Sequence, residues 1–343
     1  MPSSAATDTS PTETNMTLEA IHALALETLM AHGCDRENAD AVANIITRAE
    51  GDGCHSHGLM RLAGYVATLK SGKVNGKARP TIKTLAPAVV QVNGHNGFAP
   101  YALQEGRAHL IKAAKTCGIA AMPLIGIHHF AALWTEVEPL AEAGLVAFAC
   151  TSYKPAVIPA GGTKALYGTN PIAFGWPRPG KAPMVFDQAS SVMARGEVML
   201  AAREGHSLPD GVGVDAQGNP TNDPEEVLKG ALLAFGAHKG SSIAMMVELL
   251  AGGLIGESFS FEAAERDNGD GGPPQGGEFM FAVDPNLMGD AGGWAAHAEK
   301  LFDKIKQQDG TRLPAERRHT NRAASAMDGV NVSNIVLDKI SAL

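Results

Sequence analysis

The chain has 343 residues, of which 45% are hydrophobic and 19% are charged, and its formal net charge is −8. A chain of this length and composition is expected to fold as a globular protein with one large domain or two domains. Lys and Arg are scattered rather than clustered, so the sequence excludes a basic surface for a phosphate backbone, and we expect no nucleic-acid partner.

The N-terminal segment 1–15 is small, polar and acidic, and it lacks the basic start and apolar stretch of a signal peptide. We expect it to be a disordered tail. The longest apolar run, 243–256, contains Glu248 and three glycines and is shorter than the roughly 18 residues that span a bilayer, so no membrane partner is expected. The absence of CxxC spacing favours buried thiols in a reducing cytoplasm over disulfides at Cys34, Cys54, Cys117 and Cys150.

The first ordered part of the chain is predicted to be helical. Apolar residues at helical spacing, followed by glycine, predict a helix over 17–33. Two further helices are expected over 37–50 and 56–70, the last of them stopped by Ser71 and Gly72.

Beyond residue 79 the pattern changes to short β-rich runs separated by helical stretches. The runs lie at 88–92, 119–125, 146–153, 184–187 and 279–283. Helical spacing returns at 294–305 and 333–343, and the Gly- and Pro-rich segment 262–277 is predicted to be a surface loop. We therefore expect an α/β domain over 79–289 and a discontinuous helical domain built from 16–78 and 290–343.

The stretch CHSHGLMR at 54–61 places two histidines on either side of a serine, near the predicted start of the third helix. Residues two apart near a helix start point to different sides, so His55 and His57 cannot easily share a metal from a helix. On a strand the two histidines could share a metal, and the alternative hypothesis is a zinc site completed by the pair His128-His129. No nearby carboxylate or cysteine spacing supports it, and we expect no metal.

His57 and Arg61 are four residues apart, which on a helix places an imidazole and a guanidinium on one face. A guanidinium binds a carboxylate through two parallel hydrogen bonds, and an imidazole with a pKa near neutrality can transfer a proton beside it. This pairing predicts a small 2-oxo, 2-hydroxy or 2-imino acid as substrate. The alternative is a helix-capping histidine with an arginine in a surface ion pair, and the spacing does not decide between them.

Four other polar stretches stand next to predicted elements. GIHHFAALW at 126–134 follows a strand and opens a helix, where α/β proteins usually bind ligands. GTNPIAF at 168–174 predicts a turn, and GAHKG at 236–240 precedes an apolar helix whose N-terminus could meet a phosphate beside Lys239. RLPAERR at 312–318 brings three arginines together, although such a cluster is more often a solvated face.

A GxGxxG fingerprint between a strand and a helix is missing from this chain. The nearest stretch, GVGVDAQG at 211–218, runs into Asn219-Pro220 rather than into a helix. The sequence therefore indicates either that no dinucleotide binds or that the fold is not a Rossmann fold.

These stretches, together with LYGTNPIAFGWPR, VFDQAS and FGAHKGSSIAMMVELLAGGL, resemble the malate/L-lactate dehydrogenase-type oxidoreductases in order and over nearly the whole chain. Within that family the likeness is greatest to the Δ1-piperideine-2-carboxylate/Δ1-pyrroline-2-carboxylate reductases. The resemblance implies a non-Rossmann NAD(P)-binding mixed sheet, which accounts for the missing fingerprint. It also implies a homodimer with its active site near the subunit and domain boundaries.

The resemblance also implies roles for individual residues. His57 would be the proton donor, Ser56 a member of its relay, Arg61 the clamp on the substrate carboxylate, and Thr169 a second substrate contact. Cofactor contacts would fall on His129, Phe130, Ala131, Ala132, Leu133, Asp187, Gln188, Ala189, His238, Lys239, Arg312, Arg317 and Arg318. The three arginines favour the 2′-phosphate of NADPH over NADH.

One position departs from the family pattern. The reductases carry an aspartate in the relay where this chain has Glu197 in ARGEV. Glutamate keeps the charge with one more methylene, so it could still orient the imidazole, and Asp187 is the second candidate for that role. An acidic residue here favours the imine-reducing branch over the 2-hydroxy-acid dehydrogenases, in which a lysine is common near this site.

The expected reaction is therefore the NAD(P)H-dependent reduction of a cyclic 2-imino acid to L-proline or L-pipecolate by hydride transfer to C2. The alternatives are a malate-, lactate- or ureidoglycolate-type 2-hydroxy-acid dehydrogenase, and a non-enzymatic ligand- or metal-binding protein.

Overall fold

The computed structural model describes residues 12–129 and 131–343. Its centre is a seven-stranded mixed sheet in the order β2-β3-β4-β11-β5-β6-β7. Only β3 and β4 run parallel, and every other neighbouring pair in this sheet is antiparallel. The strands are β2 Thr81–Ala86, β3 Val89–Phe98, β4 Ile119–His128, β5 Val146–Thr151, β6 Ile172–Trp176, β7 Met184–Gln188 and β11 Gln275–Val283.

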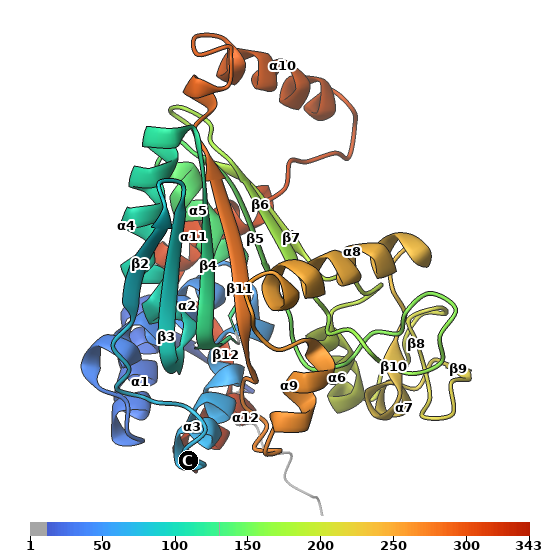
Figure 1. Cartoon of the computed structure of the whole chain (residues 1–343). Coiled ribbons are helices and arrows are strands. Elements are labelled where there is room, and N and C mark those ends of the chain that lie inside the picture. Colours follow the sequence, from blue (N-terminus) through green and yellow to red (C-terminus); the bar gives the residue numbers. More distant parts are fainter. Residues whose placement is uncertain (1–11, 130) are drawn as a thin grey trace, which may run out of the picture.

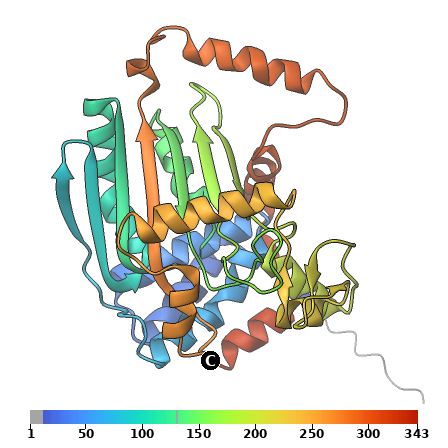
Figure 2. The same cartoon turned by 45° about the vertical axis from the view of Figure 1, so that its right-hand side comes forward.

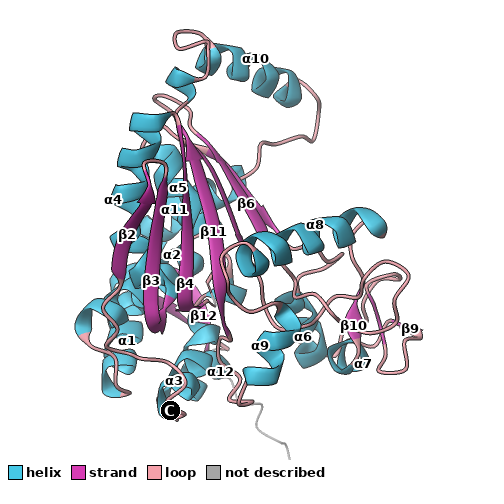
Figure 3. Cartoon of the chain, viewed as in Figure 1, coloured by secondary structure: helices cyan, strands magenta, loops and turns pink. Residues whose placement is uncertain are grey.

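Helices cover both faces of this sheet (Figures 1 and 3). On one face, α4 (Ala99–Cys117) packs on β3 and β4, and α5 (Trp134–Glu142) packs on β5 and β6. On the other face lies α8 (His238–Glu248), which continues as a π-helical turn over Leu249–Gly253. Strand β5 alternates accordingly, because Ala147 and Ala149 join the core under α4 and α5 while Phe148 and Cys150 pack under α8.

A small helical unit packs at one end of the sheet. It contains α1 (Leu18–Ala31), α2 (Arg36–Gly51) and α3 (Leu62–Lys70), as well as α12 (Asn334–Ser341). Helix α1 begins where the Thr17 hydroxyl accepts from the Ala20 amide at 3.2 Å, and its residues Ile21, Ala25 and Leu29 are fully buried on one face. The predicted first and second helices are confirmed.

The two ends of the chain meet in this unit through a strand pair that the sequence did not predict. Strand β1 (Glu13–Met16) pairs antiparallel with β12 (Val330–Ser333). The expected disordered tail is therefore wrong for its last residues, which are held by backbone hydrogen bonds to β12. Residues 1–11 of that expected tail lie outside the described residues.

A third, smaller lobe is built around a three-stranded sheet in the order β10-β8-β9. It packs its own apolar cluster between this sheet and the helices α6 and α7. Its elements are α6 Arg195–Glu204, β8 Gly213–Val214, β9 Pro220–Thr221, α7 Pro224–Lys229 and β10 Ala231–Leu232.

Two further helices differ from expectation. Helix α9 (Ser260–Arg266) occupies the start of the segment expected to be a loop. Helix α10 (Trp294–Lys306) was expected to pack with the N-terminal helices, but it lies at the opposite end of the sheet (Figure 2). There Trp294 packs edge-on against Trp176, and Glu299 receives two hydrogen bonds from Arg178. The domain boundaries themselves stay a prediction.

Helix α11 (Glu316–Asp328) does pack on the N-terminal unit, against α2. All four cysteines are free. The expectation that they are buried is confirmed for Cys34 and Cys150, but Cys54 is half-buried and Cys117 is exposed at the end of α4. None of the described helices combines the length and the apolar composition needed to cross a membrane.

Candidate active site

The His-Ser-His stretch forms a 3₁₀ turn, η1 (His55–His57), followed after Gly58 by a second one, η2 (Leu59–Arg61). The prediction of one continuous helix over 56–70 is wrong, because α3 begins only at Leu62. The cause is the buried Glu50 carboxylate of α2, which accepts from the Leu59 amide at 2.7 Å and from His55 Nδ1 at 2.5 Å. These bonds hold the turn against the end of α2.

His57 and Arg61 therefore do not share the face of one α-helix, but they lie close together. The Ser56 hydroxyl is 3.1 Å from His57 Nδ1, and the Ser56 carbonyl accepts from Arg61 Nε at 2.6 Å. Ser56 thus connects the imidazole and the guanidinium.

The pKa of His57 is lowered to about 3 by burial, by the charge of Arg61 and by that of His129. This corrects the expectation of a pKa near neutrality, and it makes His57 a neutral imidazole at pH 7. The edge of Trp134 faces the ring, with the two ring centroids 6.4 Å apart. Because a bound carboxylate would offset the charge of Arg61, substrate binding should raise the pKa of His57.

The guanidinium of Arg61 is half-buried beside the start of α6. Burial lowers the pKa of Arg61, and the neighbouring Tyr153 and Tyr65 oppose that shift. A Cβ on Gly196 of α6 would lie 3.2 Å from Ser56 Cβ and 3.6 Å from Arg61 Nη2, so α6 packs closely against both residues at this position.

Sequence reasoning missed two residues near Arg61, namely Tyr153 and Arg195. Burial raises the pKa of Tyr153, and the charges of Arg61 and Arg195 oppose that shift. Burial lowers the pKa of Arg195 itself. Their signal in the sequence was their position just after a strand and just before a helix, where α/β proteins place ligand-binding side chains.

Neither carboxylate that was expected to orient His57 is hydrogen-bonded to it among the described residues. Glu197 lies in the first turn of α6 with an exposed side chain. Asp187 accepts from the Trp134 amide at 3.2 Å, and burial raises its pKa against the opposing charge of Arg318. Ser56 is the hydrogen-bonding neighbour of the imidazole, and the role of either carboxylate stays a prediction.

The expected cofactor residues in this part of the chain fall on two segments, one after β4 and one at the end of β7. His129, Ala132 and Leu133 follow β4 and are buried. Ala131 is half-buried, and Phe130 lies outside the described residues. Asp187, Gln188 and Ala189 stand at the end of β7, with Gln188 exposed.

Beyond β7 a cavity of about 360 Å³ opens between the small lobe and the start of α8. Four glycines, Gly161, Gly162, Gly211 and Gly236, are among its lining residues, and His238 and Lys239 stand exposed at the adjacent helix N-terminus. Glycine lets a ligand approach the backbone, and a helix N-terminus favours anions. The volume, the glycines and the ammonium group of Lys239 fit part of a nicotinamide dinucleotide.

The arginine segment divides at the start of α11. Arg318 is half-buried, donates from Nη2 to the Val185 carbonyl at 2.8 Å, and lies 5.1 Å over the Trp134 ring. Arg312 and Arg317 are exposed. Arg318 is thus the member of the segment that lies over Trp134, whose ring faces His57.

Thr169 precedes β6 in a turn held by buried hydrogen bonds. Its carbonyl accepts from the amide and the hydroxyl of Ser190, each at 2.8 Å. The next residue, Asn170, is fully buried and donates to Glu248 at 2.7 Å. Thr169 is therefore placed firmly between the end of β7 and α8, although the structure alone assigns it no ligand.

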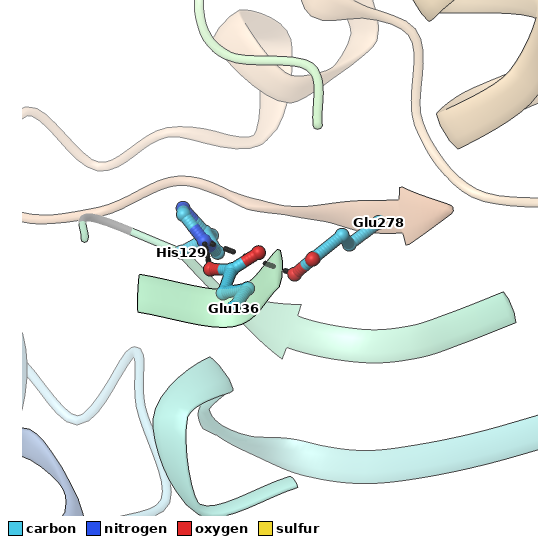
Figure 4. Close-up of side chains that lie close together, drawn as sticks. All are labelled: His129, Glu136 and Glu278. Atoms are coloured by element: carbon cyan, nitrogen blue, oxygen red, sulfur yellow. Dashed lines mark hydrogen bonds and ion pairs between the residues drawn. The ribbon is translucent and has the colours of Figure 1, made fainter. Parts of the chain in front are cut away.

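The four histidines of the zinc hypothesis have separate partners. His55 binds Glu50, His57 neighbours Ser56, and His128 Nδ1 lies 3.3 Å from the Pro273 carbonyl. Among the described residues, a group of three potential metal ligands occurs only at His129, Glu136 and Glu278, whose donor atoms all lie within 4.8 Å of one another (Figure 4).

In that group the His129 Nε2 to Glu136 Oε1 distance is 2.6 Å, which is the length of a hydrogen bond. Two ligands bound to one cation at about 2.0–2.2 Å each stand further apart than this. His129 and Glu136 are therefore a hydrogen-bonded pair, and Glu278 lies beside them. Sequence reasoning missed both carboxylates, whose signal was a charged residue inside the apolar stretches of α5 and β11.

Comparison with known proteins agrees with this geometry. The model of the malate/L-lactate dehydrogenase family matches residues 16–341. The Delta(1)-pyrroline-2-carboxylate reductase of Ancylobacter novellus is 48% identical over 96% of this chain and 97% of its own. The Delta(1)-pyrroline-2-carboxylate/Delta(1)-piperideine-2-carboxylate reductase of Pseudomonas aeruginosa is also 48% identical, over 96% and 98%.

A solved structure is similar over the same extent. The crystal structure of delta1-piperideine-2-carboxylate reductase from Pseudomonas syringae pv. tomato superposes with a TM-score of 0.91 at 42% identity and covers 96% of this chain and 99% of its own. The expected non-Rossmann mixed sheet is thereby confirmed.

Proposed function

The chain belongs to the malate/L-lactate dehydrogenase family, and from this premise we propose that it reduces cyclic 2-imino acids with a nicotinamide cofactor. The substrates would be Δ1-pyrroline-2-carboxylate and Δ1-piperideine-2-carboxylate, and the products L-proline and L-pipecolate. Relatives at 42–48% identity that are named for these reductions support the choice. The observation that carries it is the partly buried Arg61 guanidinium joined through Ser56 to the neutral His57.

The roles of the residues follow from that arrangement. Arg61 binds the carboxylate of the substrate, with the phenol of Tyr153 beside it, and Thr169 is a further substrate contact. The carboxylate offsets the charge of Arg61, so His57 can then hold and donate the proton that the imine nitrogen requires. Ser56 orients the imidazole through Nδ1, and Glu197 or Asp187 is proposed to add charge to this relay.

The cofactor would lie along His129–Leu133, Asp187–Ala189, His238 and Lys239, with Arg318 at its edge. When bound, the reduced nicotinamide supplies the hydride that C2 accepts. We propose NADPH as the preferred form, because the arginines at 312, 317 and 318 can pair with a 2′-phosphate. The chain would act as a homodimer in the cytoplasm.

A 2-hydroxy-acid dehydrogenase is the second candidate, because the matching family model is described by malate and L-lactate. Steady-state rates with pyrroline-2-carboxylate, piperideine-2-carboxylate, pyruvate and oxaloacetate, each with NADPH and with NADH, separate the two. We expect turnover of the two imino acids with NADPH, and a loss of about 100-fold or more in kcat for His57→Ala.

Arg61→Lys should mainly raise KM, because a single ammonium cannot replace the two parallel hydrogen bonds of the guanidinium. Faster turnover of pyruvate or oxaloacetate would assign the chain to the second candidate, and unchanged kcat in His57→Ala would remove His57 as the acid.

A further inference from the structure

Two buried carboxyl groups, those of Glu136 and Glu278, form a cluster with the imidazole of His129 (Figure 4). Glu278 lies on β11 between β4 and β5 and is 0% exposed, and Glu136 lies on α5 and is 2% exposed. His129 Nε2 is 2.6 Å from Glu136 Oε1 and 3.7 Å from Glu278 Oε2. The cluster joins the central strand of the sheet to the loop that leads into α5.

The cluster lacks the partners that two ionised carboxylates would need. Both oxygens of Glu278 and one oxygen of Glu136 are buried without a hydrogen-bond partner among the described residues. Burying an unpaired carboxylate costs several kcal/mol. The two carboxyl groups have oxygens within 4.8 Å of each other, and two ionised carboxylates this close repel each other strongly. A proton on one of them removes the repulsion and satisfies an oxygen of the other.

We propose that Glu136 and Glu278 share a proton, and that this pair is the buried proton source that recharges the acid of the reaction by way of His129. The first half of this proposal concerns the resting protein alone. The second half rests on the proposed function, because it assigns the proton to the reduction of an imine.

The charges around the pair agree with a stored proton. Burial raises the pKa of Glu278 well above its usual range, and the charge of Glu136 raises it further. Burial also raises the pKa of Glu136 to about 7, while a hydrogen bond with Glu278 and the charge of Arg107 oppose this shift and the charge of Asp187 adds to it. With both pKa values raised, the pair keeps a shared proton near neutral pH.

Three other titratable groups near the pair do not store this proton. Burial lowers the pKa of His129, and burial raises the pKa of Cys150 and of Tyr65, so all three are neutral near pH 7. The guanidinium of Arg107 stays charged. Of the groups named here, Glu136 is the one whose pKa lies near neutrality.

The reduction needs such a source because it consumes a proton inside a closed pocket. A C–H bond forms at C2 with the incoming hydride, the electron pair of the C=N π bond moves to nitrogen, and a proton completes the N–H bond. His57 is neutral in the resting site, so it must receive a proton before it can give one. Trp134, whose ring lies 6.4 Å from that of His57 between centroids, begins the helix that carries Glu136, and this places the cluster on the side of His57 that Trp134 faces.

The stored proton can be observed without any substrate. Infrared spectra of the purified protein at about pH 8 should contain the carbonyl stretch of a protonated carboxylic acid. Ordinary carboxyl groups are fully ionised at this pH and do not contribute to that band. Glu278→Gln keeps the size and the donor group and should remove this band. Glu257→Gln is the matched control: Glu257 is also partly buried with a raised pKa, yet it binds the Gly126 amide outside the cluster, so the band should remain.

The dependence of kcat on pH tests whether the pair transfers its proton to the reaction. In Glu278→Gln, Glu136 can still supply a proton at about pH 6 but not at about pH 9, so kcat should match the parent at the lower pH and fall by about 100-fold at the higher one. A loss that is equal at every pH would indicate a structural role and overturn the transfer. Binding of NADPH, followed by its fluorescence, should be unchanged.

A second variant keeps the test decisive if Glu278→Gln does not fold. Glu136→Gln removes the acceptor between Glu278 and His129, so the band should persist and kcat should fall while the binding of NADPH stays unchanged. Absence of the band from the parent protein, or a stoichiometric divalent metal that Glu278→Gln abolishes, would overturn the shared proton. A band in a protein that reduces no imino acid would instead leave the shared proton standing and reject the proposed function.

Discussion

At the residue scale, Gly58 shows how closely the catalytic turn is fitted to the end of α2. A Cβ at this position would lie 2.0 Å from Glu50 Oε1, so the carboxylate could not stay where it accepts from the Leu59 amide. A requirement for glycine here comes from contact rather than from backbone conformation, since φ is −90°.

Gly58→Ala is therefore expected to displace the His-Ser-His turn. The strain should cost about 1–3 kcal/mol of unfolding free energy, and a shift of the imidazole by about 1 Å should lower kcat by about 100-fold. Urea unfolding and steady-state rates measure the two effects. The control is Gly292→Ala, because a Cβ there meets nothing within 4 Å. Equal activity of the two variants would show that Glu50 can move without disturbing His57.

At the element scale, one arginine of α11 joins three helical elements. Arg322 donates to both oxygens of Asp52, the C-cap of α2, at 2.7 Å each, and to Glu138 of α5 at 2.9 and 3.2 Å. Asp52 and Glu138 are each 1% exposed. The indole of Trp134 also donates to Asp52 at 3.0 Å, so this ion-pair network positions the ring that faces His57.

Arg322→Met should destabilise the protein by about 3 kcal/mol, because it leaves buried carboxylates short of a partner. The value lies at the lower end of the usual range since Arg48 still pairs with Glu138 and Trp134 with Asp52. The urea midpoint measures it. Lys229→Met breaks an exposed ion pair with Glu226 and should leave the midpoint unchanged. An equally small effect of both variants would mean that solvent reaches Asp52.

At the scale of the whole molecule, the strand pair of β1 and β12 joins the two ends of the chain. Val330 and Val332 of β12 are buried in the same core as Ile21, and the Asn15 side chain donates to the Asp328 carbonyl at 3.1 Å. The helical unit is thus completed by residues more than 300 positions apart.

A chain that begins at Thr17 should accordingly be less stable than one that begins at Thr12. Loss of β1 exposes one edge of β12 and removes its ladder of hydrogen bonds, and a cost of about 2 kcal/mol corresponds to a fall in Tm of roughly 3 °C for a chain of this length. Thermal unfolding followed by circular dichroism compares the two chains. Identical Tm values would show that β12 is held by the core beneath it alone.

Local patterns in the sequence determined the type of most elements. The helical spacing of Ile21, Ala25 and Leu29 and the apolar runs at 119–125, 146–153 and 279–283 each specify an element whatever surrounds it, because one face of a helix or a strand must be buried. The mixed non-Rossmann sheet followed from the family resemblance and the missing glycine fingerprint.

Tertiary structure decided the features that depend on residues far apart in sequence. The helix expected over 56–70 becomes two 3₁₀ turns because Glu50 binds the Leu59 amide, and α10 packs against Trp176 rather than the N-terminal helices. No local pattern reports such contacts.

The same distinction holds for the candidate site. The sequence by itself determined which residue types stand at 56–61, whereas burial and the neighbouring charges of Arg61 and His129 decided that His57 is neutral. Glu136 and Glu278 come together only when α5 packs on the sheet, 142 residues apart in the chain, because desolvation and hydrogen bonding act through space and not along the sequence.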